Sequence, residues 1–170
     1  IRVMYESVDS LNQWLDRVGR WTCLTGAGLS ADSGIPTYRD HKGQWLGAQP
    51  IQHQEFIDNP VKRRRYWSRS AVGWPAVSAA RPTPLHDALA SFEHQGRLRS
   101  IITQTVDRLH QAAGSLSVID LHGRLDQVCC LACSASEHRD SVQRRLLMAN
   151  PHLEAQSTSV KPDGDADIAD

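Results

Sequence analysis

Residues 21–31 have the sequence WTCLTGAGLSA, a short β-prone run that passes directly into a glycine-rich turn. The turn fits the pattern Gly-x-Gly-x-x-Gly/Ala, in which Gly26 permits a tight turn and Gly28 lets the backbone approach a pyrophosphate. The first N–H groups of the helix that follows would face that phosphate. Glycine turns after strands are common, so these residues on their own also fit a plain turn.

Segments typical of strands and helices alternate on both sides of this turn. The predicted strands cover residues 21–25, 98–103 and 118–121. The predicted helices cover residues 9–19, 30–36, 61–73, 84–96, 106–113 and 141–149. Residues 40–60 are expected to be loop with a short helix. Such alternation predicts an α/β fold with a largely parallel sheet.

Composition and charge exclude several classes of protein. The 170 residues carry 19 Lys plus Arg and 19 Asp plus Glu, so the formal net charge is zero. A neutral chain has no general attraction to nucleic acid or to an anionic membrane. No stretch approaches the roughly 18 apolar residues that a membrane span needs. We therefore expect no direct nucleic-acid partner and no membrane partner. The start at Ile1 and the end at Asp170, without a closing helix or strand, suggest a fragment at both ends.

The four cysteines are not spread as a disulfide framework would be. Cys129, Cys130 and Cys133 lie within five positions, and Cys23 lies in an apolar run. This spacing indicates a reducing, cytosolic setting. Cys130-x-x-Cys133 supplies two thiolates for a tetrahedral metal, and no later cysteine completes the set. Cys129 is expected to be a neighbour of that site, and Cys23 a buried core residue.

Four motifs, in order along the chain, resemble the signatures of the sirtuin family. They are GAGLSADSGIPTYR from Gly26, TQTVDRLH from Thr103, LHG from Leu121 and CLAC from Cys130. Residues 66–75 (YWSRSAVGWP) and 162–165 (PDGD) look most like the class II branch, which includes a mitochondrial lipoamidase. The resemblance implies an NAD-dependent protein lysine deacylase that releases nicotinamide and O-acyl-ADP-ribose, with acylated lysines of proteins as partners.

The resemblance also implies roles for single residues. His122 would be the general base on a ribose hydroxyl, which its unperturbed pKa of about 6.5 permits. Gln104 would bond a ribose hydroxyl and Asp107 the nicotinamide carboxamide. The full set of implied cofactor-binding residues is Gly26, Ala27, Gly28, Ser30, Pro36, Tyr38, Arg39, Gln104, Thr105 and Asp107. Without the resemblance, His122 fits a plain loop residue and Asp107 a helix cap.

Two positions leave alternatives open. Thr105 stands where the family usually has asparagine, and threonine cannot offer an amide donor and acceptor together. It favours a non-catalytic module that binds NAD or ADP-ribose, whereas His122 and Asp107 favour an enzyme, either the deacylase or a mono-ADP-ribosyltransferase. Tyr66-x-x-Arg69 fits a pair that grips acidic acyl groups in one sirtuin branch. It equally fits a surface arginine on a basic, solvated helix.

The expected layout is a Rossmann-like parallel sheet, incomplete in this chain, over residues 1–40 and 80–125. A helical insertion covers residues 41–79. Residues 126–170 form the first half of a small zinc-binding module with a structural zinc, of whose four ligands Cys130 and Cys133 are two. The expected location is the cytoplasm of a bacterium, or the mitochondrial matrix if the protein is eukaryotic.

Overall fold

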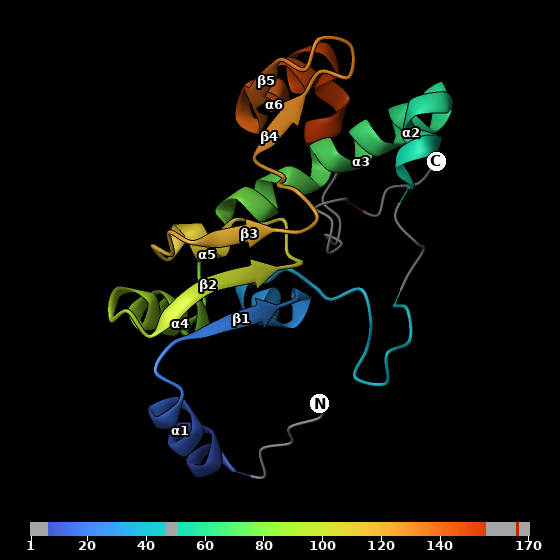
Figure 1. Ribbon diagram of the computed structural model, residues 1–170. Helices are drawn as coiled ribbons and strands as arrows, with labels where there is room; N and C mark the ends of the chain where they lie inside the picture. The colour runs from blue at the N-terminus through green and yellow to red at the C-terminus, as the bar shows by residue number, and fades with distance from the viewer. Residues whose placement is uncertain (1–6, 47–50, 156–165, 167–170) are drawn as a thin grey trace.

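The computed structural model describes residues 7–46, 51–155 and 166 (Figure 1). The strands are β1 (Trp21–Thr25), β2 (Leu98–Thr103), β3 (Val118–Asp120), β4 (Gln127–Cys129) and β5 (Ser136–His138). The α-helices are α1 (Val8–Arg17), α2 (His53–Asp58), α3 (Pro60–Ala79), α4 (Pro84–His94), α5 (Leu109–Ala112) and α6 (Arg139–Ala149). Two 3₁₀ helices are η1 (Ala27–Ser33) and η2 (Pro151–Ala155).

The first three strands form a parallel sheet in the order β1-β2-β3, which confirms the predicted α/β fold. The register aligns Thr25 with Thr103, and Thr103 with Asp120. These three residues each end their strand, so the segments that follow them all leave the sheet at one edge. Ligands of open α/β sheets bind at this carboxyl edge.

The two faces of this sheet are covered differently. On one face Ile101 lies fully buried, with Leu89 of α4 and with Leu98 at the start of β2. The side chains of parallel-strand partners point to the same face, so Leu24, Ile102 and Ile119 form a row across the opposite face. Leu24 is 65% exposed and Ile119 is 53% exposed. Among the described residues, this second face has no comparable cover.

A second, antiparallel sheet of β4 and β5 packs with α6 against α3 (Figure 1). These strands have only three residues each, too few for a periodic pattern, and the sequence did not predict them. Trp74 of α3 donates its indole N–H to Asp140 at 2.8 Å. Gln143 of α6 donates its amide to the backbone oxygen of Ala71 at 2.6 Å.

That last contact explains why α3 runs on to Ala79, beyond the predicted end near Gly73. Pro75 has no N–H, so the carbonyl four residues earlier, that of Ala71, loses its partner inside the helix. Gln143 supplies the missing donor from a different helix. The proline is therefore accommodated by tertiary structure.

Other differences from the prediction concern where two helices begin and how exposed one arginine is. The helix after the glycine turn begins at Ala27 and is 3₁₀, and α5 begins at Leu109 instead of Val106. The prediction of a solvated basic helix holds for Arg64 and Arg65, which are exposed. It is wrong for Arg69, which is 8% exposed and donates its Nε–H to the backbone oxygen of Ala166 at 3.0 Å.

Two further expectations concern membrane-spanning helices and the burial of Cys23 in β1. No helix within residues 7–46 and 51–155 is both long and apolar enough to cross a membrane. Cys23 is half-buried, and this burial raises the pKa of its thiol. The PDGD segment at residues 162–165 lies outside the described residues.

Candidate functional site

Three of the four motifs meet at the carboxyl edge of the parallel sheet. The Gln104 N–H donates to the backbone oxygen of Thr25 at 3.0 Å. The Leu121 N–H donates to the backbone oxygen of Thr103 at 2.9 Å. The glycine turn, the segment from Gln104 and the segment from Leu121 therefore begin side by side, although they lie far apart in the sequence.

Asp107 joins two of these segments directly. Its Oδ2 accepts a hydrogen bond of 2.6 Å from the hydroxyl of Ser30, 77 residues away. Its Oδ1 accepts the Leu109 N–H at 2.9 Å, which fixes the start of α5. Asp107 thus accepts the first N–H of α5, although the N-cap residue is Arg108, and the same carboxylate also bonds the glycine turn.

The glycine turn itself leaves room for a ligand. A Cβ atom placed on Gly26 or Gly28 would meet no heavy atom within 4 Å. Gly26 precedes η1, so the N–H groups of Ala27 and Gly28 have no acceptor within that helix. Open space beside unpaired backbone donors fits a phosphate group. Ser30 is only 1% exposed, and its hydroxyl donates to Asp107, so its direct contact with a phosphate stays a prediction.

Thr105 is turned into the protein. It is 8% exposed, and its hydroxyl lies 2.9 Å from the Thr103 hydroxyl and 3.4 Å from Oδ1 of Asp107. The neighbouring Gln104, by contrast, is exposed at the edge of the sheet. Of these two polar side chains, only Gln104 is presented to solvent.

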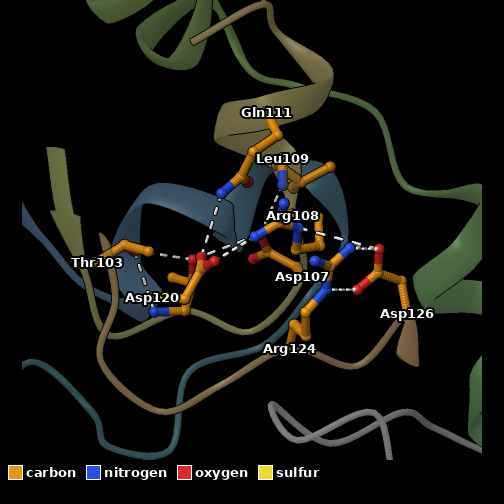
Figure 2. A network of polar contacts seen from close by, with 9 residues as sticks. Thr103, Asp107, Arg108, Leu109, Gln111, Asp120, Arg124 and Asp126 are labelled. Atoms are coloured by element: carbon orange, nitrogen blue, oxygen red, sulfur yellow. Dashed lines mark hydrogen bonds and ion pairs between the residues drawn. The ribbon is translucent and has the colours of Figure 1, made fainter. Parts of the chain in front are cut away.

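His122 is exposed in the loop after β3, and a network of ion pairs brackets this loop (Figure 2). Arg108 donates a hydrogen bond to Asp120, which precedes the loop. Its Nε lies 4.0 Å from Oδ2 of Asp126, which follows the loop. Arg124 donates two hydrogen bonds to Asp126, at 2.6 and 2.5 Å. These bonds hold the pKa of the Asp126 carboxyl below its usual range.

This network was not predicted from the sequence, although the three charged residues Asp120, Arg124 and Asp126 around Leu121-His122-Gly123 are a visible signal. Gln111 of α5 adds an amide donor to Asp120 at 3.2 Å. Arg108 has a φ of 69°, a value that is strained for a residue with a side chain. The network thus ties the turn before α5 to the loop that carries His122.

A buried pair of histidines lies beneath the glycine turn and was also missed. Nε2 of His110 lies 2.9 Å from the hydroxyl of Thr25, the residue before Gly26. The ring centres of His110 and His86 are 4.8 Å apart, and both residues are at most 1% exposed. Burial and, to a lesser degree, the neighbouring His86 lower the pKa of His110 to about 4. Burial also lowers the pKa of His86, so both imidazoles are neutral near pH 7.

Pro36, Tyr38 and Arg39 follow η1 in a separate loop. Arg39 donates to the backbone oxygen of Gly43 at 2.7 Å and lies over the ring of Trp45, 4.3 Å from its centre. The Tyr38 ring meets the same tryptophan edge-on at 5.9 Å. Pro36 is half-buried beside the core residue Ile35. Their approach to a ribose or phosphate stays a prediction.

The fourth motif forms the turn between β4 and β5. The Ser134 N–H donates to the Cys130 oxygen at 2.9 Å, and the Cys130 N–H donates to the Ala135 oxygen at the same distance. Hydrogen bonds from the backbone of Cys133 and Ala132 lower the pKa of the Cys130 thiol. The described residues contain no group of three or more side chains that could hold a metal ion. The described residues therefore do not show the predicted metal site.

Comparisons with known proteins agree with this geometry. The family model described as "Sir2 family" matches residues 26–164. A "NAD-dependent protein deacetylase" of Xanthomonas axonopodis pv. citri is 50% identical over 161 residues, which cover 95% of this chain and 55% of that protein. A "NAD-dependent protein deacetylase 2" of Bradyrhizobium diazoefficiens is 49% identical over 94% of this chain and 58% of its own length.

Solved structures show the same likeness. A Sir2 protein with a p53 peptide and NAD+ superposes with a TM-score of 0.71 at 28% identity, covering 94% of this chain and 61% of that one. A Sir2 homologue mutant in complex with ADP ribose gives a TM-score of 0.61 at 37% identity over 74% of this chain and 52% of that one. The chain spans about half the length of the curated relatives that it matches. With a sheet edge that joins three motifs and a family model that covers most of its residues, the chain belongs to the Sir2 family.

Proposed function

We propose that the protein containing this chain is an NAD-dependent protein lysine deacylase. The observation that carries the proposal is the bond between Ser30 and Asp107, which joins the glycine turn to the second motif at the carboxyl edge of the sheet. The relatives named as NAD-dependent protein deacetylases support the same activity. They extend well beyond this chain, so the proposal concerns the whole protein.

The described residues fit NAD at this edge. The cofactor, when bound, supplies the ADP-ribosyl group that accepts the acyl group while nicotinamide leaves. The Ala27 and Gly28 N–H groups bind phosphate, and exposed Gln104 binds a ribose hydroxyl. Asp107, oriented by Ser30, accepts from the carboxamide. Pro36, Tyr38 and Arg39 close over the ligand and exclude water.

His122 takes the proton from a ribose hydroxyl. Its exposed position leaves the imidazole accessible to a ligand, and the ion pairs on both sides of its loop limit the loop's movement. A positioned general base of this kind contributes about 100- to 10,000-fold in rate. Mono-ADP-ribosyl transfer would use the same residues with a different acceptor.

One observation favours a second candidate, a module that binds NAD or ADP-ribose without turnover. Thr105 is buried, and its hydroxyl is engaged with Thr103. Threonine has no amide, so at the position where the family usually has asparagine the ligand meets neither an amide donor nor an amide acceptor. Binding through the glycine turn and Gln104 would remain.

The experiment measures nicotinamide release from NAD by the whole protein over a panel of acyl-lysine peptides. We expect release that requires a peptide, and a loss of deacylation of about 100-fold or more in His122→Ala. NAD affinity should change little, because the proposed phosphate contacts come from the glycine turn and not from His122. Tight NAD binding without release on any peptide would instead establish the binding module.

We further propose that Cys130 and Cys133 hold half of a structural zinc site, within a module over residues 126–170. The turn supports this, since its N–H groups point at the Cys130 thiol and favour the thiolate form. The other two ligands would come from a longer protein. Metal analysis of the whole protein tests the proposal: Cys130→Ser should lose zinc and melt earlier, whereas an unchanged zinc content would exclude this pair.

A longer protein also suits the sheet. The row of Leu24, Ile102 and Ile119, of which Leu24 and Ile119 are exposed, is what further strands and helices would cover, because parallel sheets are buried on both faces. The proposed layout keeps residues 1–40 and 80–125 in the Rossmann-like part and residues 41–79 as the helical insertion. Residues 66–75 support the class II branch, and the bacterial relatives support a cytoplasmic location.

A further inference from the structure

Arg139, the first residue of α6, is a buried cation without a counter-ion. It is 3% exposed, and burial lowers the pKa of its guanidinium. One nitrogen, Nη2, donates to the backbone oxygen and to the hydroxyl of Ser70, both at 3.2 Å. The other, Nη1, is buried and has no hydrogen-bond partner among the described residues. No carboxylate in the described part of the chain forms an ion pair with it.

The charge of Asp140 raises the pKa of Arg139 less than burial lowers it, and the two side chains form no ion pair. Asp140 follows Arg139 in α6, and its Oδ1 accepts the indole N–H of Trp74 at 2.8 Å. Asp126, across the loop, is already paired with Arg124 and Arg108 (Figure 2). Burying a charge that is not paired costs several kcal/mol. The tryptophan faces beside Arg139 offset only part of that cost.

Those faces form the walls of a small cavity. The guanidinium carbon lies 5.6 Å from the ring centre of Trp67 and 5.3 Å from that of Trp74. The cavity has a volume of ≈ 40 Å³ and is lined by residues of α3, of the loop after His122, of β4 and of α6. Its lining includes Arg139 and Arg124 and no acidic residue. A site of this size holds a few water-sized groups and excludes a nucleotide or an acyl chain.

We propose that this cavity binds a small monovalent anion, of the size of a halide or formate, on the Arg139 guanidinium. Such an anion supplies the negative charge that the cavity lacks and a hydrogen-bond acceptor for the Arg139 guanidinium. A water molecule would supply only the acceptor. The site lies at the junction of α3 and α6, so the bound anion stabilises the contact between the β4–β5–α6 unit and the rest of the chain. This role is separate from the proposed activity and does not depend on it.

The first experiment measures thermal unfolding while sodium chloride replaces sodium gluconate at constant ionic strength. Gluconate is too large for the cavity, so any difference reports a specific anion. At ten times the dissociation constant, chloride should raise the folding equilibrium constant about 11-fold. That corresponds to a rise in Tm of about 3–6 °C for a chain of this length. Formate should act like chloride, and sulfate should not.

The variants are Arg139→Gln and, as a control, Arg144→Gln. Both lie in α6 and both remove one positive charge, but Arg144 is exposed and lies outside the cavity. We expect Arg139→Gln to abolish the dependence on chloride and Arg144→Gln to keep it. Equal responses in the two variants would overturn the proposal.

A measurement on the unmodified protein decides the question even if Arg139→Gln does not fold. Bromide replaces chloride in crystals, and its anomalous scattering locates the ion. We expect a peak in the cavity, within hydrogen-bond distance of a guanidinium nitrogen of Arg139. The absence of a peak there, together with a Tm that is independent of the anion, would show that the cavity holds only water.

Discussion

At the scale of single residues, His110 links the glycine turn to the protein interior. Its Nε2 meets the Thr25 hydroxyl at 2.9 Å, directly before Gly26, and its ring packs on that of His86. Protonation of His110 would place a charge in this buried site. The described charges that oppose this effect, on Asp107 and Asp120, raise its pKa less than burial lowers it.

Stability should therefore fall as the pH falls. The pKa of His110 is about 4 in the folded chain and 6.5 in the unfolded one, so the neutral form stabilises the fold fully above pH 6.5. That contribution, about 3 kcal/mol, is lost as the pH falls from 6.5 to 4. Urea unfolding at a series of pH values measures it. His110→Gln should flatten the slope over this interval, and the exposed His41→Gln should not. An unchanged slope in His110→Gln would contradict the assignment.

At the scale of elements, the interior of α3 depends on α6. Gln143 donates to the Ala71 carbonyl that Pro75 leaves without a helical partner. Gln143→Met keeps the side-chain volume but leaves that buried carbonyl unsatisfied, so we expect a loss of about 1–3 kcal/mol in unfolding free energy.

The double variant tests the cause. Pro75→Ala restores an N–H that can donate to Ala71, so Gln143→Met should cost much less in that background. Chemical denaturation of the four proteins in this cycle gives the coupling energy. Additive effects of the two substitutions would mean that Gln143 stabilises α3 by packing alone.

At the scale of the whole molecule, the parallel sheet is covered on one face and open on the other. Leu24 and Ile119 expose more than half of their surface on the open face. We expect the 170-residue chain to bind an apolar dye and to self-associate as its concentration rises. Leu24→Thr with Ile119→Thr should reduce both effects with little loss of stability. Met148→Thr, which changes an exposed residue of α6 away from the sheet, should reduce neither.

Light scattering and dye fluorescence make the measurement. If the whole protein covers this face, as we propose, it should bind less dye than the isolated 170-residue chain. Equal dye binding per molecule would mean that the remainder of the protein leaves the face open.

The sequence determined the strands of the parallel sheet, most of the helices and the order of the motifs, because those features depend on residues close to one another in the chain. Trp21–Thr25 and Leu98–Thr103 were predicted with their correct bounds. The tertiary structure decided what no local pattern contains: the bond from Ser30 to Asp107, the histidine pair under Thr25, and the burial of Arg69 and Arg139. Each of these depends on contacts between segments that are distant in sequence, and the environment of a side chain exists only once those segments have packed.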